Sequence, residues 1–245
     1  MTVHHLVDLA APEVRALAAS GAPALWAIGS TEQHGSHLVT GFDLASAQAV
    51  CERAAMQCPR DVALLPGLPF GCSDHWLVLG ATWSLTPATL ASVIGDVARS
   101  AAAIGFQRLT IVNGHHGNTG PGLSAISGML DPAITVEFLS YWTLVEQDAI
   151  RALSVSDGGG IGHAGEVETA IALYLGGLAI EDRLPAPAGK SLADGPGLND
   201  PIARLPRPLE EAPGGVYGNH GTATVELGRL MIERAAERLA EHLAN

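Results

Sequence analysis

The stretch that decides the expected fold is ALWAIGSTEQHGSHLVTGFD, residues 24–43. It begins with a short apolar run at 24–29, which has the length of a buried strand, and continues as a polar loop that ends at Asp43. Further short apolar runs follow at 62–66, 108–113 and 134–140. Longer Ala-rich stretches separate these runs. Strands that alternate with helices are typical of a parallel sheet covered on both faces, so we expect an α/β fold.

Helices are expected in the stretches between and after these strands. Their ranges are 11–20, 44–57, 87–104, 119–130, 141–153, 165–176 and 222–243. The pair Thr86-Pro87 is a helix start signal, because Pro suits the first helical turn. The last helix is amphipathic. Its apolar face consists of Leu227, Met231, Ala235, Leu239 and Leu243.

The composition sets limits on the function. The chain has 245 residues, and its 13 basic and 25 acidic side chains give a formal net charge of −12. This length suits a single domain, residues 1–245, with a sizeable core. The acidic balance argues against nucleic acid or an anionic membrane as a partner. Only 16% of the residues are charged, so part of the surface is expected to be buried between subunits.

Two further features concern the cellular compartment. The Ala-rich stretch 88–106 contains Asp96 and Arg99, which argues against a membrane span, and the N-terminal residues do not resemble a signal peptide. The three cysteines, Cys51, Cys58 and Cys72, form no C-x-x-C motif. They are expected as reduced thiols of a cytoplasmic protein.

Seven of the ten histidines fall in five short segments that have the character of loops or element ends. These segments are STEQHGSHLVTGFD (30–43), FGCSDHW (70–76), NGHHGN (113–118), GGGIGHAGEVET (158–169) and YGNHG (217–221). Two of them directly follow predicted strands. In open α/β sheets, ligands bind beyond the carboxyl ends of the strands. Loops that carry His, Asp and Glu there predict a functional site.

The first segment supplies Glu32, His34, His37 and Asp43. An imidazole two residues after a carboxylate can converge with it on one point in an extended loop. Asp43 opens the next predicted helix, and its two oxygens could bridge two cations. The alternative is that Asp43 is only the N-cap of that helix, and the sequence leaves both interpretations open.

The later segments offer further ligands. In NGHHGN, the turn after the strand points either His115 or His116 into the cleft. In the segment 158–169, His163 precedes Glu166 and Glu168 at a helix start. Residues two apart on a helix face different directions, so at most one of these carboxylates is expected in a site. A favourable interaction with the helix dipole is the structural alternative for either of them.

Nucleotide and nucleophile motifs are disfavoured. Gly189-Lys190-Ser191 ends like a P-loop, but Leu184 stands where the first glycine belongs. The glycines at 160, 162 and 165 match G-x-G-x-x-G after a poor strand, which makes a dinucleotide-dependent oxidoreductase a weak alternative. No G-x-S-x-G nucleophile elbow occurs in the sequence.

Taken together, these segments resemble the creatininase family of metal-dependent amidohydrolases. The motifs that carry the resemblance are GSTEQHG (29–35) with Asp43, FGCSDH (70–75), NGHHGN (113–118), HAGEVET (163–169) and GVYG (215–218). They occur in the order of the family and span nearly the whole chain. The resemblance implies a three-layer α/β/α sandwich with a mostly parallel central sheet. It also implies two divalent metals and a ring-shaped homo-oligomer, commonly a hexamer.

Carried over by position, the resemblance implies that Glu32, Asp43 and His115 hold one metal. His34, Asp43 and a further carboxylate would hold the other. Creatininase proper places that carboxylate two residues after the strand-end histidine, where this chain has Gly117. Other members use the Glu of the later motif, which is Glu168 here. This departure, with Val39, Phe42 and His116 at other motif positions, places the chain in the wider family rather than with creatininase itself.

The implied reaction is hydrolysis of a C–N bond in a small amide or cyclic amide. The ligand types suit Zn²⁺, Mn²⁺ or Fe²⁺, and a hydroxide held between two such ions would attack the carbonyl. Glu32 is assigned a catalytic role as well as a ligand role. His163 is the candidate proton donor to the leaving nitrogen, or else it orients a ligand. Substrate contacts are assigned to Ser73, His75, His116 and Trp142, although Trp142 suits a buried core equally well.

Alternatives remain both for the substrate and for the class of protein. The substrate could be a cyclic amide, a formamide on a pyrimidine, or the end of a peptide, in which case the protein is a peptide-trimming peptidase. The chain could instead be a non-catalytic oligomeric binding protein that contains metal. Metal-dependent turnover of any amide separates these two classes. The Pro- and Gly-rich segment 185–215 is expected to be a lid or an oligomer contact.

Overall fold

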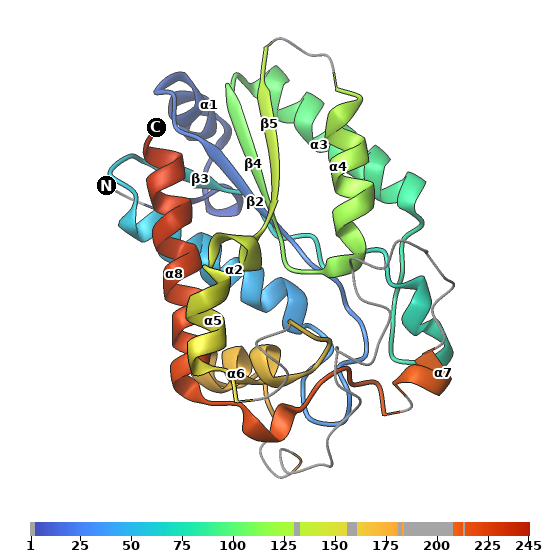
Figure 1. The fold of residues 1–245 in the computed structure, drawn as a ribbon. Coiled ribbons are helices and arrows are strands. Elements are labelled where there is room, and N and C mark those ends of the chain that lie inside the picture. The colour runs from blue at the N-terminus through green and yellow to red at the C-terminus, as the bar shows by residue number, and fades with distance from the viewer. Residues whose placement is uncertain (1–2, 130–132, 156–160, 181–182, 184–207, 213) are drawn as a thin grey trace.

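The central feature of the fold is a five-stranded, wholly parallel sheet (Figure 1). The computed structural model describes residues 3–129, 133–155, 161–180, 183, 208–212 and 214–245. The strand order is β1-β3-β2-β4-β5. The strands are β1 (Val3–His5), β2 (Ala24–Ile28), β3 (Val62–Leu64), β4 (Arg108–Asn113) and β5 (Thr135–Ser140). The expected α/β fold with a parallel sheet is therefore confirmed.

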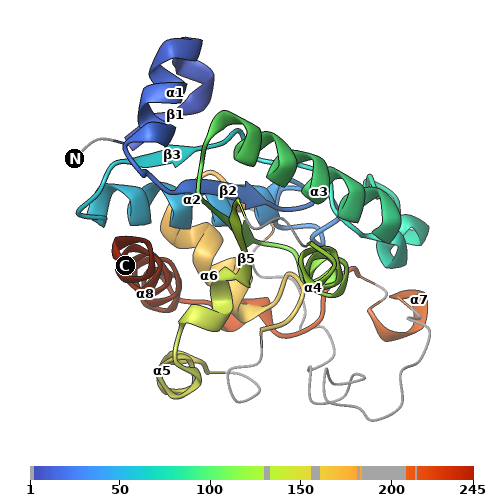
Figure 2. The same cartoon turned by 90° about the horizontal axis from the view of Figure 1, so that it is seen from above.

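Helices cover both faces of this sheet and form a three-layer α/β/α arrangement. One face packs against α2 (Phe42–Gln57), α6 (Glu166–Leu175) and α8 (Val225–Ala244). The other face packs against α1 (Ala11–Ala19), α3 (Pro87–Ile104) and α4 (Thr119–Ser127). Figure 2 shows α3 and α8 on opposite sides of the strands.

The pleat of β2 explains why both layers form. Leu25 and Ala27 belong to the core beneath α2 and α8, whereas Ala24, Trp26 and Ile28 belong to the core beneath α3. Successive side chains of a strand point to opposite faces, so a continuous apolar run supplies both cores. All residues of β2 are buried.

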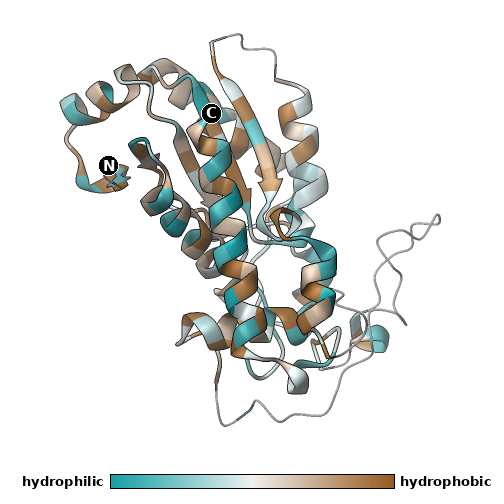
Figure 3. Cartoon of the chain, turned by 60° about the vertical axis from the view of Figure 1, so that its left-hand side comes forward, coloured by the Kyte–Doolittle hydropathy of each residue, from teal (hydrophilic) through white to brown (hydrophobic). Residues whose placement is uncertain are grey.

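The helix boundaries follow local signals in the sequence. The hydroxyl of Thr86 accepts a hydrogen bond from the backbone N–H of Thr89 and caps α3. Thr224 caps α8 in the same way, through the N–H of Leu227. Figure 3 shows apolar and polar residues on different sides of α8. All members of its predicted apolar face are fully buried, so this helix was correctly predicted from its periodicity.

One expected helix was wrong, and one strand was not predicted. The predicted helix 141–153 is divided into a 3-10 turn, η4 (Tyr141–Leu144), and the short helix α5 (Gln147–Leu153). The backbone is extended at Val145 and Glu146. Val145 is buried there, and Glu146 pairs with Arg234 of α8, so tertiary contacts override the local helix propensity. Strand β1 was not predicted, because three residues at a sheet edge give no periodic signal.

The remaining helical element, α7 (Pro208–Glu211), lies at the end of the segment 185–215. Most of that segment, including Gly189-Lys190-Ser191, lies outside the described residues. Cys51, Cys58 and Cys72 are buried and free. No helix in the described ranges combines the length and the apolar character that a membrane span needs.

Candidate metal centre

Loops and helix starts bring imidazoles and carboxylates together beyond the carboxyl ends of β2 and β4. Glu32 and His34 lie in the loop after β2, and Asp43 lies in the first turn of α2. His115 follows β4, and Glu168 lies in the first turn of α6. The side chains of the first four are nearly inaccessible, since none of these residues is more than 4% exposed.

Asp43 lies at the centre of this cluster. Its Oδ1 lies 3.1 Å from Nε2 of His34, and its Oδ2 lies 3.0 Å from Nδ1 of His115. Nδ1 of His115 also lies 3.3 Å from Oε1 of Glu32. Nε2 of His34 lies 3.7 Å from Oε2 of Glu168. The structure thus forms two groups that share Asp43, namely Glu32–Asp43–His115 and His34–Asp43–Glu168.

Several of these atoms are buried and have no hydrogen-bond partner within the described part of the chain. They are both carboxylate oxygens of Glu32, Oδ2 of Asp43 and Nε2 of His34. A buried polar atom without a partner costs about 1–3 kcal/mol. Divalent cations would balance the carboxylates and use the nitrogen lone pairs, and such nitrogen and oxygen donors suit Zn²⁺, Mn²⁺ or Fe²⁺. The residues present therefore fit a metal site.

The opposite nitrogen of each histidine ring is anchored to the backbone. Nδ1 of His34 lies 3.2 Å from the carbonyl oxygen of Glu32. Nε2 of His115 lies 3.0 Å from the carbonyl oxygen of Cys72. Because a carbonyl oxygen only accepts hydrogen bonds, these nitrogens carry the proton in the neutral ring. The other nitrogen then turns a lone pair toward the carboxylates, as in metal-binding histidines.

Ser73 contacts the His115 ring at Nε2, the nitrogen that faces away from the carboxylates. It is fully buried, and its Oγ lies 3.1 Å from Nε2 of His115. The same Oγ lies 2.6 Å from Oγ of Ser30. The predicted role of Ser73 as a substrate contact is therefore not supported, because its hydroxyl is enclosed by protein atoms. Its position favours a role in orienting His115.

The interpretation of Asp43 as a simple N-cap is wrong. Helix α2 begins at Phe42 with Gly41 as its N-cap, and no side chain caps it. Asp43 is the second residue of the helix, and its carboxylate points at the two histidines. Ionised Asp43 also interacts favourably with the positive end of the helix dipole.

Glu168 is the carboxylate of α6 that reaches the cluster. Besides facing His34, its Oε2 accepts a 2.5 Å hydrogen bond from the backbone N–H of Ala164. Ala164 has a φ of 52°, a left-handed conformation that is unusual for alanine. The contact with Glu168 holds this turn, which carries the neighbouring His163.

Glu166 is buried, not exposed as the dipole interpretation required. It is 4% exposed, and its Oε2 accepts a 2.5 Å hydrogen bond from the hydroxyl of Ser154. Its Oε1 accepts a 2.8 Å hydrogen bond from the backbone N–H of Val155. The sequence did not show that the chain after α5 would pass over the start of α6. Glu166 therefore fastens these two elements together.

Position 117 has no space for the carboxylate that the resemblance to creatininase proper would place there. A Cβ atom on Gly117 would lie 2.1 Å from the carbonyl oxygen of Cys72 and 2.5 Å from Nε2 of His115. Contacts this short require a shift of the backbone that anchors His115. Glycine at position 117 thus allows the backbone to hold His115 in place. Glu168 supplies the second carboxylate of the group formed with His34 and Asp43.

His163 faces the cluster from the side of α6. Its Nδ1 lies 3.4 Å from Oε1 of Glu32, and its Nε2 lies 2.8 Å from the carbonyl oxygen of Gln33. The ring of Trp76 stacks on it at 4.3 Å. Sequence reasoning missed Gln33 and Trp76, although each is adjacent in sequence to a predicted site residue.

The other predicted substrate contacts lie at the rim of the cluster. His75 is half-buried, and its ring is parallel to that of His115 at 6.0 Å. His116 is exposed, and its ring lies 6.4 Å from that of Trp142. Trp142 is half-buried and packs partly against the core.

Burial and neighbouring charges shift the pKa values of the cluster in different directions. Burial alone would lower the pKa of His34, but the carboxylates of Asp43, Glu168 and Glu32 together outweigh it and raise this pKa to about 10. Burial raises the pKa of Glu168 to about 7, although His34 opposes the shift. Burial together with the nearby His34 lowers the pKa of His163 to about 3. His163 is therefore neutral at pH 7 in this arrangement.

His37 and His220 lie against each other, a contact that was not predicted from the sequence. The rings of His37 and His220 are stacked at 4.0 Å, and both residues are buried. Nε2 of His37 lies 3.0 Å from the hydroxyl of Thr169, next to Glu168. Burial and the adjacent His220 lower the pKa of His37 to about 4, so this ring packs in its neutral form.

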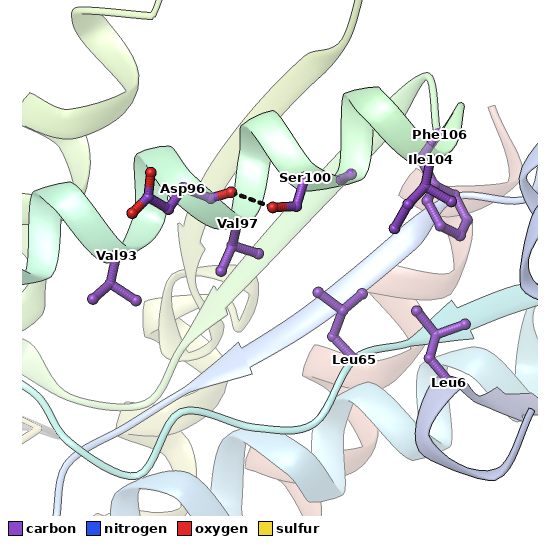
Figure 4. Close-up of a pocket in the computed structure, with 9 residues that line it drawn as sticks. Leu6, Leu65, Val93, Asp96, Val97, Ser100, Ile104 and Phe106 are labelled. Atoms are coloured by element: carbon purple, nitrogen blue, oxygen red, sulfur yellow. Dashed lines mark hydrogen bonds between the residues drawn. The ribbon is translucent and has the colours of Figure 1, made fainter. Parts of the chain in front are cut away.

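A separate cavity of about 470 Å³ lies between α3 and the residues that follow β1 and β3 (Figure 4). Its lining is mainly apolar and includes Leu6, Val93, Val97 and Phe106. The cavity shares no residue with the cluster described above. Its only carboxylate, Asp96, pairs with Arg99 at 3.0 Å.

The chain is similar to proteins of known activity. A family model described as creatinine amidohydrolase matches residues 7–243. Creatinine amidohydrolase of Pseudomonas putida is 29% identical over 233 residues, or 87% of this chain and 85% of that protein. Mycofactocin precursor peptide peptidase of Mycobacterium ulcerans is 28% identical over 225 residues, or 89% of this chain and 82% of that protein.

Solved structures give the same result. The crystal structure of creatinine amidohydrolase matches with a TM-score of 0.81 and 28% identity, over 97% of this chain and 95% of that chain. A mutant creatininase of the Zn-Zn type matches with a TM-score of 0.82 and 26% identity, over 99% and 97%. The structure described as creatininase Mn matches with a TM-score of 0.81 and 28% identity, over 98% and 97%.

Fold and cluster together define a hydrolase with an α/β/α architecture and candidate metal-binding residues. The chain belongs to the creatininase family. The resemblance noted from the sequence motifs is confirmed by this match.

Proposed function

We propose that the protein is a dinuclear metal-dependent amidohydrolase that cleaves the C–N bond of a small amide or cyclic amide. The observation that carries the proposal is the convergence on Asp43 of buried carboxylate and imidazole atoms that have no hydrogen-bond partner among the described residues. In this proposal, Glu32, Asp43 and His115 hold one cation, and His34, Asp43 and Glu168 hold the other. Zn²⁺, Mn²⁺ and Fe²⁺ suit these donors. The structures of creatininase with zinc or manganese support the first two.

The bound cations would supply a water nucleophile at neutral pH and polarise the scissile carbonyl. Residues of the chain position the ligand atoms and the proton-transfer group for this reaction. The backbone anchors on His34 and His115 fix their tautomers before any cation binds. Glu32 contributes two oxygens, one of which lies 3.4 Å from Nδ1 of His163. In the proposal Nδ1 of neutral His163 accepts the proton that the attacking water releases and then donates it to the leaving nitrogen, while Nε2–H remains on the carbonyl oxygen of Gln33.

The substrate is proposed to enter past His75, His116 and Trp142. Among the residues predicted to contact substrate, these three side chains are accessible to solvent, whereas Ser73 is buried. They offer imidazole donors and one aromatic face, which suit a planar amide group.

A peptide-trimming peptidase is the second candidate. The match to mycofactocin precursor peptide peptidase covers as much of the chain as the match to creatinine amidohydrolase. Position 117 also departs from creatininase proper, because it has no space for a carboxylate.

The test is turnover by metal-loaded protein of three amide classes, namely creatinine, a formamidopyrimidine and a short peptide with a free carboxyl end. Chelation should abolish turnover, and Glu32→Gln should abolish it without unfolding. Cleavage of the peptide alone identifies a peptidase. Fully loaded protein that cleaves none of these would indicate the non-catalytic metal-containing alternative.

The domain organisation and the cellular compartment of the enzyme are also proposals. Residues 1–245 are taken as one domain, and the family match over 7–243 supports this. The three buried free cysteines support a reducing compartment, for which we propose the cytoplasm.

A further inference from the structure

Gln33 has a buried side chain beside the site that the proposed function does not use. The residue is 7% exposed. Its Oε1 accepts a 3.0 Å hydrogen bond from the backbone N–H of Gly35, and its Nε2 donates a 3.2 Å hydrogen bond to the carbonyl oxygen of Gly215. These two contacts fix the orientation of the amide, because exchanging its oxygen and nitrogen would lose both hydrogen bonds.

The two glycines that contact Gln33 leave room for this arrangement. Gly35 has a φ of 64° and Gly215 a φ of 71°, left-handed conformations that glycine adopts without strain. A Cβ atom on Gly215 would overlap with Oε1 of Gln33. The backbone around Gln33 therefore admits the amide at one defined position.

Both polar groups of Gln33 reach the same atom of His163. The main-chain carbonyl oxygen of Gln33 lies 2.8 Å from Nε2 of His163, and the side-chain Nε2 of Gln33 lies 2.9 Å from it. A carbonyl oxygen only accepts hydrogen bonds, and an amide N–H only donates them. Nε2 of His163 therefore has a partner whether it carries a proton or a lone pair.

The ring of His163 lies against two other rings, which restrict its rotation. The centroids of the Trp76 and His34 rings each lie 4.3 Å from that of His163. Nδ1 of His163 lies 3.4 Å from Oε1 of Glu32. The lowered pKa of His163 leaves its ring neutral at pH 7, so the ring carries one proton. The surroundings of the two nitrogens decide which of them carries it.

The charge of Glu32 favours one of these two positions. Its Oε1 is buried and has no hydrogen-bond partner among the described residues. A carboxylate attracts an N–H at Nδ1 of His163 and repels a lone pair there. While the carboxylate is unbalanced, the proton favours Nδ1, and the amide of Gln33 donates to Nε2. When a cation balances Glu32, this attraction weakens and the proton favours Nε2, where the carbonyl of Gln33 accepts it.

From this geometry we propose that Gln33 is a positioning residue that partners both neutral forms of His163, so that the ring proton moves from Nδ1 to Nε2 when a cation occupies the site. The Nδ1–H bond breaks, the Nε2–H bond forms, and solvent water takes up one proton and supplies the other. Nδ1 then has a lone pair that can accept a proton. The response to the cation rests on the proposed function, whereas the form of the metal-free protein does not.

The position of the proton is measured by ¹⁵N NMR of protein labelled at its histidines, because protonated and unprotonated ring nitrogens differ in chemical shift. The signals that are missing from His163→Phe identify His163. Metal-free wild-type protein at neutral pH should carry the proton on Nδ1. Gln33→Leu, which removes the amide and keeps the main-chain carbonyl, should carry it on Nε2. Gln33→Met repeats the test if Gln33→Leu does not fold, as judged by circular dichroism.

Tyr217→Phe is the matched control. It removes a 2.8 Å hydrogen bond to Glu211 from the segment that holds Gln33 at Gly215, and it leaves the contacts of Nε2 of His163 in place. This variant should keep the proton on Nδ1. The role of Gln33 is overturned if metal-free wild-type protein carries the proton on Nε2, or if a folded Gln33 variant keeps the wild-type pattern.

The response to the cation is tested by adding Zn²⁺ and repeating the spectra. The wild-type signals should change from the Nδ1–H to the Nε2–H pattern, and those of Gln33→Leu should not change. Wild-type protein that binds Zn²⁺, as measured by elemental analysis, and keeps the proton on Nδ1 overturns the response and leaves the proposed function intact. Protein that binds no Zn²⁺ overturns the proposed function and the response together, while the metal-free spectra still decide the role of Gln33.

Discussion

Nε2 of His34 lies 3.1 Å from Oδ1 of Asp43, and neither residue is more than 2% exposed. This contact joins the loop after β2 to the start of the next helix, so that two segments separated in sequence form one site. Neither side chain can turn toward water. Their charges must be balanced in place, which is the basis of the predictions that follow.

Asp43→Asn should lose at least one metal and most of the hydrolytic activity. An amide presents one neutral oxygen where the carboxylate presents two charged ones, so it cannot bridge the two ligand groups. Elemental analysis after loading with Zn²⁺ measures the loss. An Asn variant that keeps both metals and its activity would show that Asp43 is not the bridging residue.

Glu168→Gln and Glu166→Gln should have different effects. Glu168→Gln should weaken one metal site, because Glu168 is the carboxylate that faces His34 at 3.7 Å. Glu166→Gln should keep both metals and instead destabilise the fold by about 1–3 kcal/mol, since one of its buried hydrogen bonds is lost. Metal content and thermal unfolding of both variants separate the two effects. Loss of metal from Glu166→Gln alone would reverse the assignment.

Ser73→Ala should weaken metal binding while the rest of the fold is retained. Its hydroxyl lies against Nε2 of His115, and partners of this kind change metal affinity by about 10–100-fold. Calorimetric titration with Zn²⁺ is the measurement. Ser92→Ala is a suitable control, because Ser92 lies on the exposed side of α3 and its hydroxyl donates a hydrogen bond to the carbonyl of Ala88 in the same helix. If Ser73 contacted substrate instead, KM would rise and Zn²⁺ affinity would stay unchanged.

Gly117→Ala should destabilise the protein and displace His115. The added Cβ would meet the carbonyl oxygen of Cys72 at 2.1 Å, and overpacking of this kind costs about 1–3 kcal/mol. Gly120→Ala is the matched control, because its added Cβ meets no atom within 4 Å. Urea unfolding of both variants compares them, and equal stabilities would contradict this account of position 117.

Stability should fall in acid partly because of His37. Burial lowers its pKa in the folded state from 6.5 to about 4. Between these values the unfolded chain binds more protons, so the free energy of unfolding decreases as the pH falls through this range. A shift of this size corresponds to at most about 3 kcal/mol. His37→Phe should flatten the dependence of stability on pH, whereas His5→Phe, at an exposed position, should not.

Much of the fold was predictable because its signals are local. The apolar runs of β2 and β4 and the Thr86-Pro87 start of α3 appear within a few residues of sequence. The break in 141–153 was not predictable, because it depends on the pairing of Glu146 with Arg234 from a distant helix. The edge strand β1 also has no local signal, and its formation depends on β3.

For the site, the central residues were predictable from the sequence, but the contacts around them were not. The chemical types of Glu32, His34, Asp43, His115 and Glu168, and their places at element ends, pointed to one cluster, and the structure brings these residues together. The supporting contacts were not predictable. The enclosure of Ser73, the burial of Glu166 and the stacking of Trp76 on His163 depend on how separate loops pack, which spacing along the chain does not show.

The central claim is that the cluster around Asp43 holds two divalent cations. The most direct measurement is elemental analysis of the purified chain after loading with Zn²⁺ or Mn²⁺ and removal of the excess. We predict about two ions per chain, and fewer in Asp43→Asn. Protein that contains no metal and also fails to bind added Zn²⁺ or Mn²⁺ would contradict it.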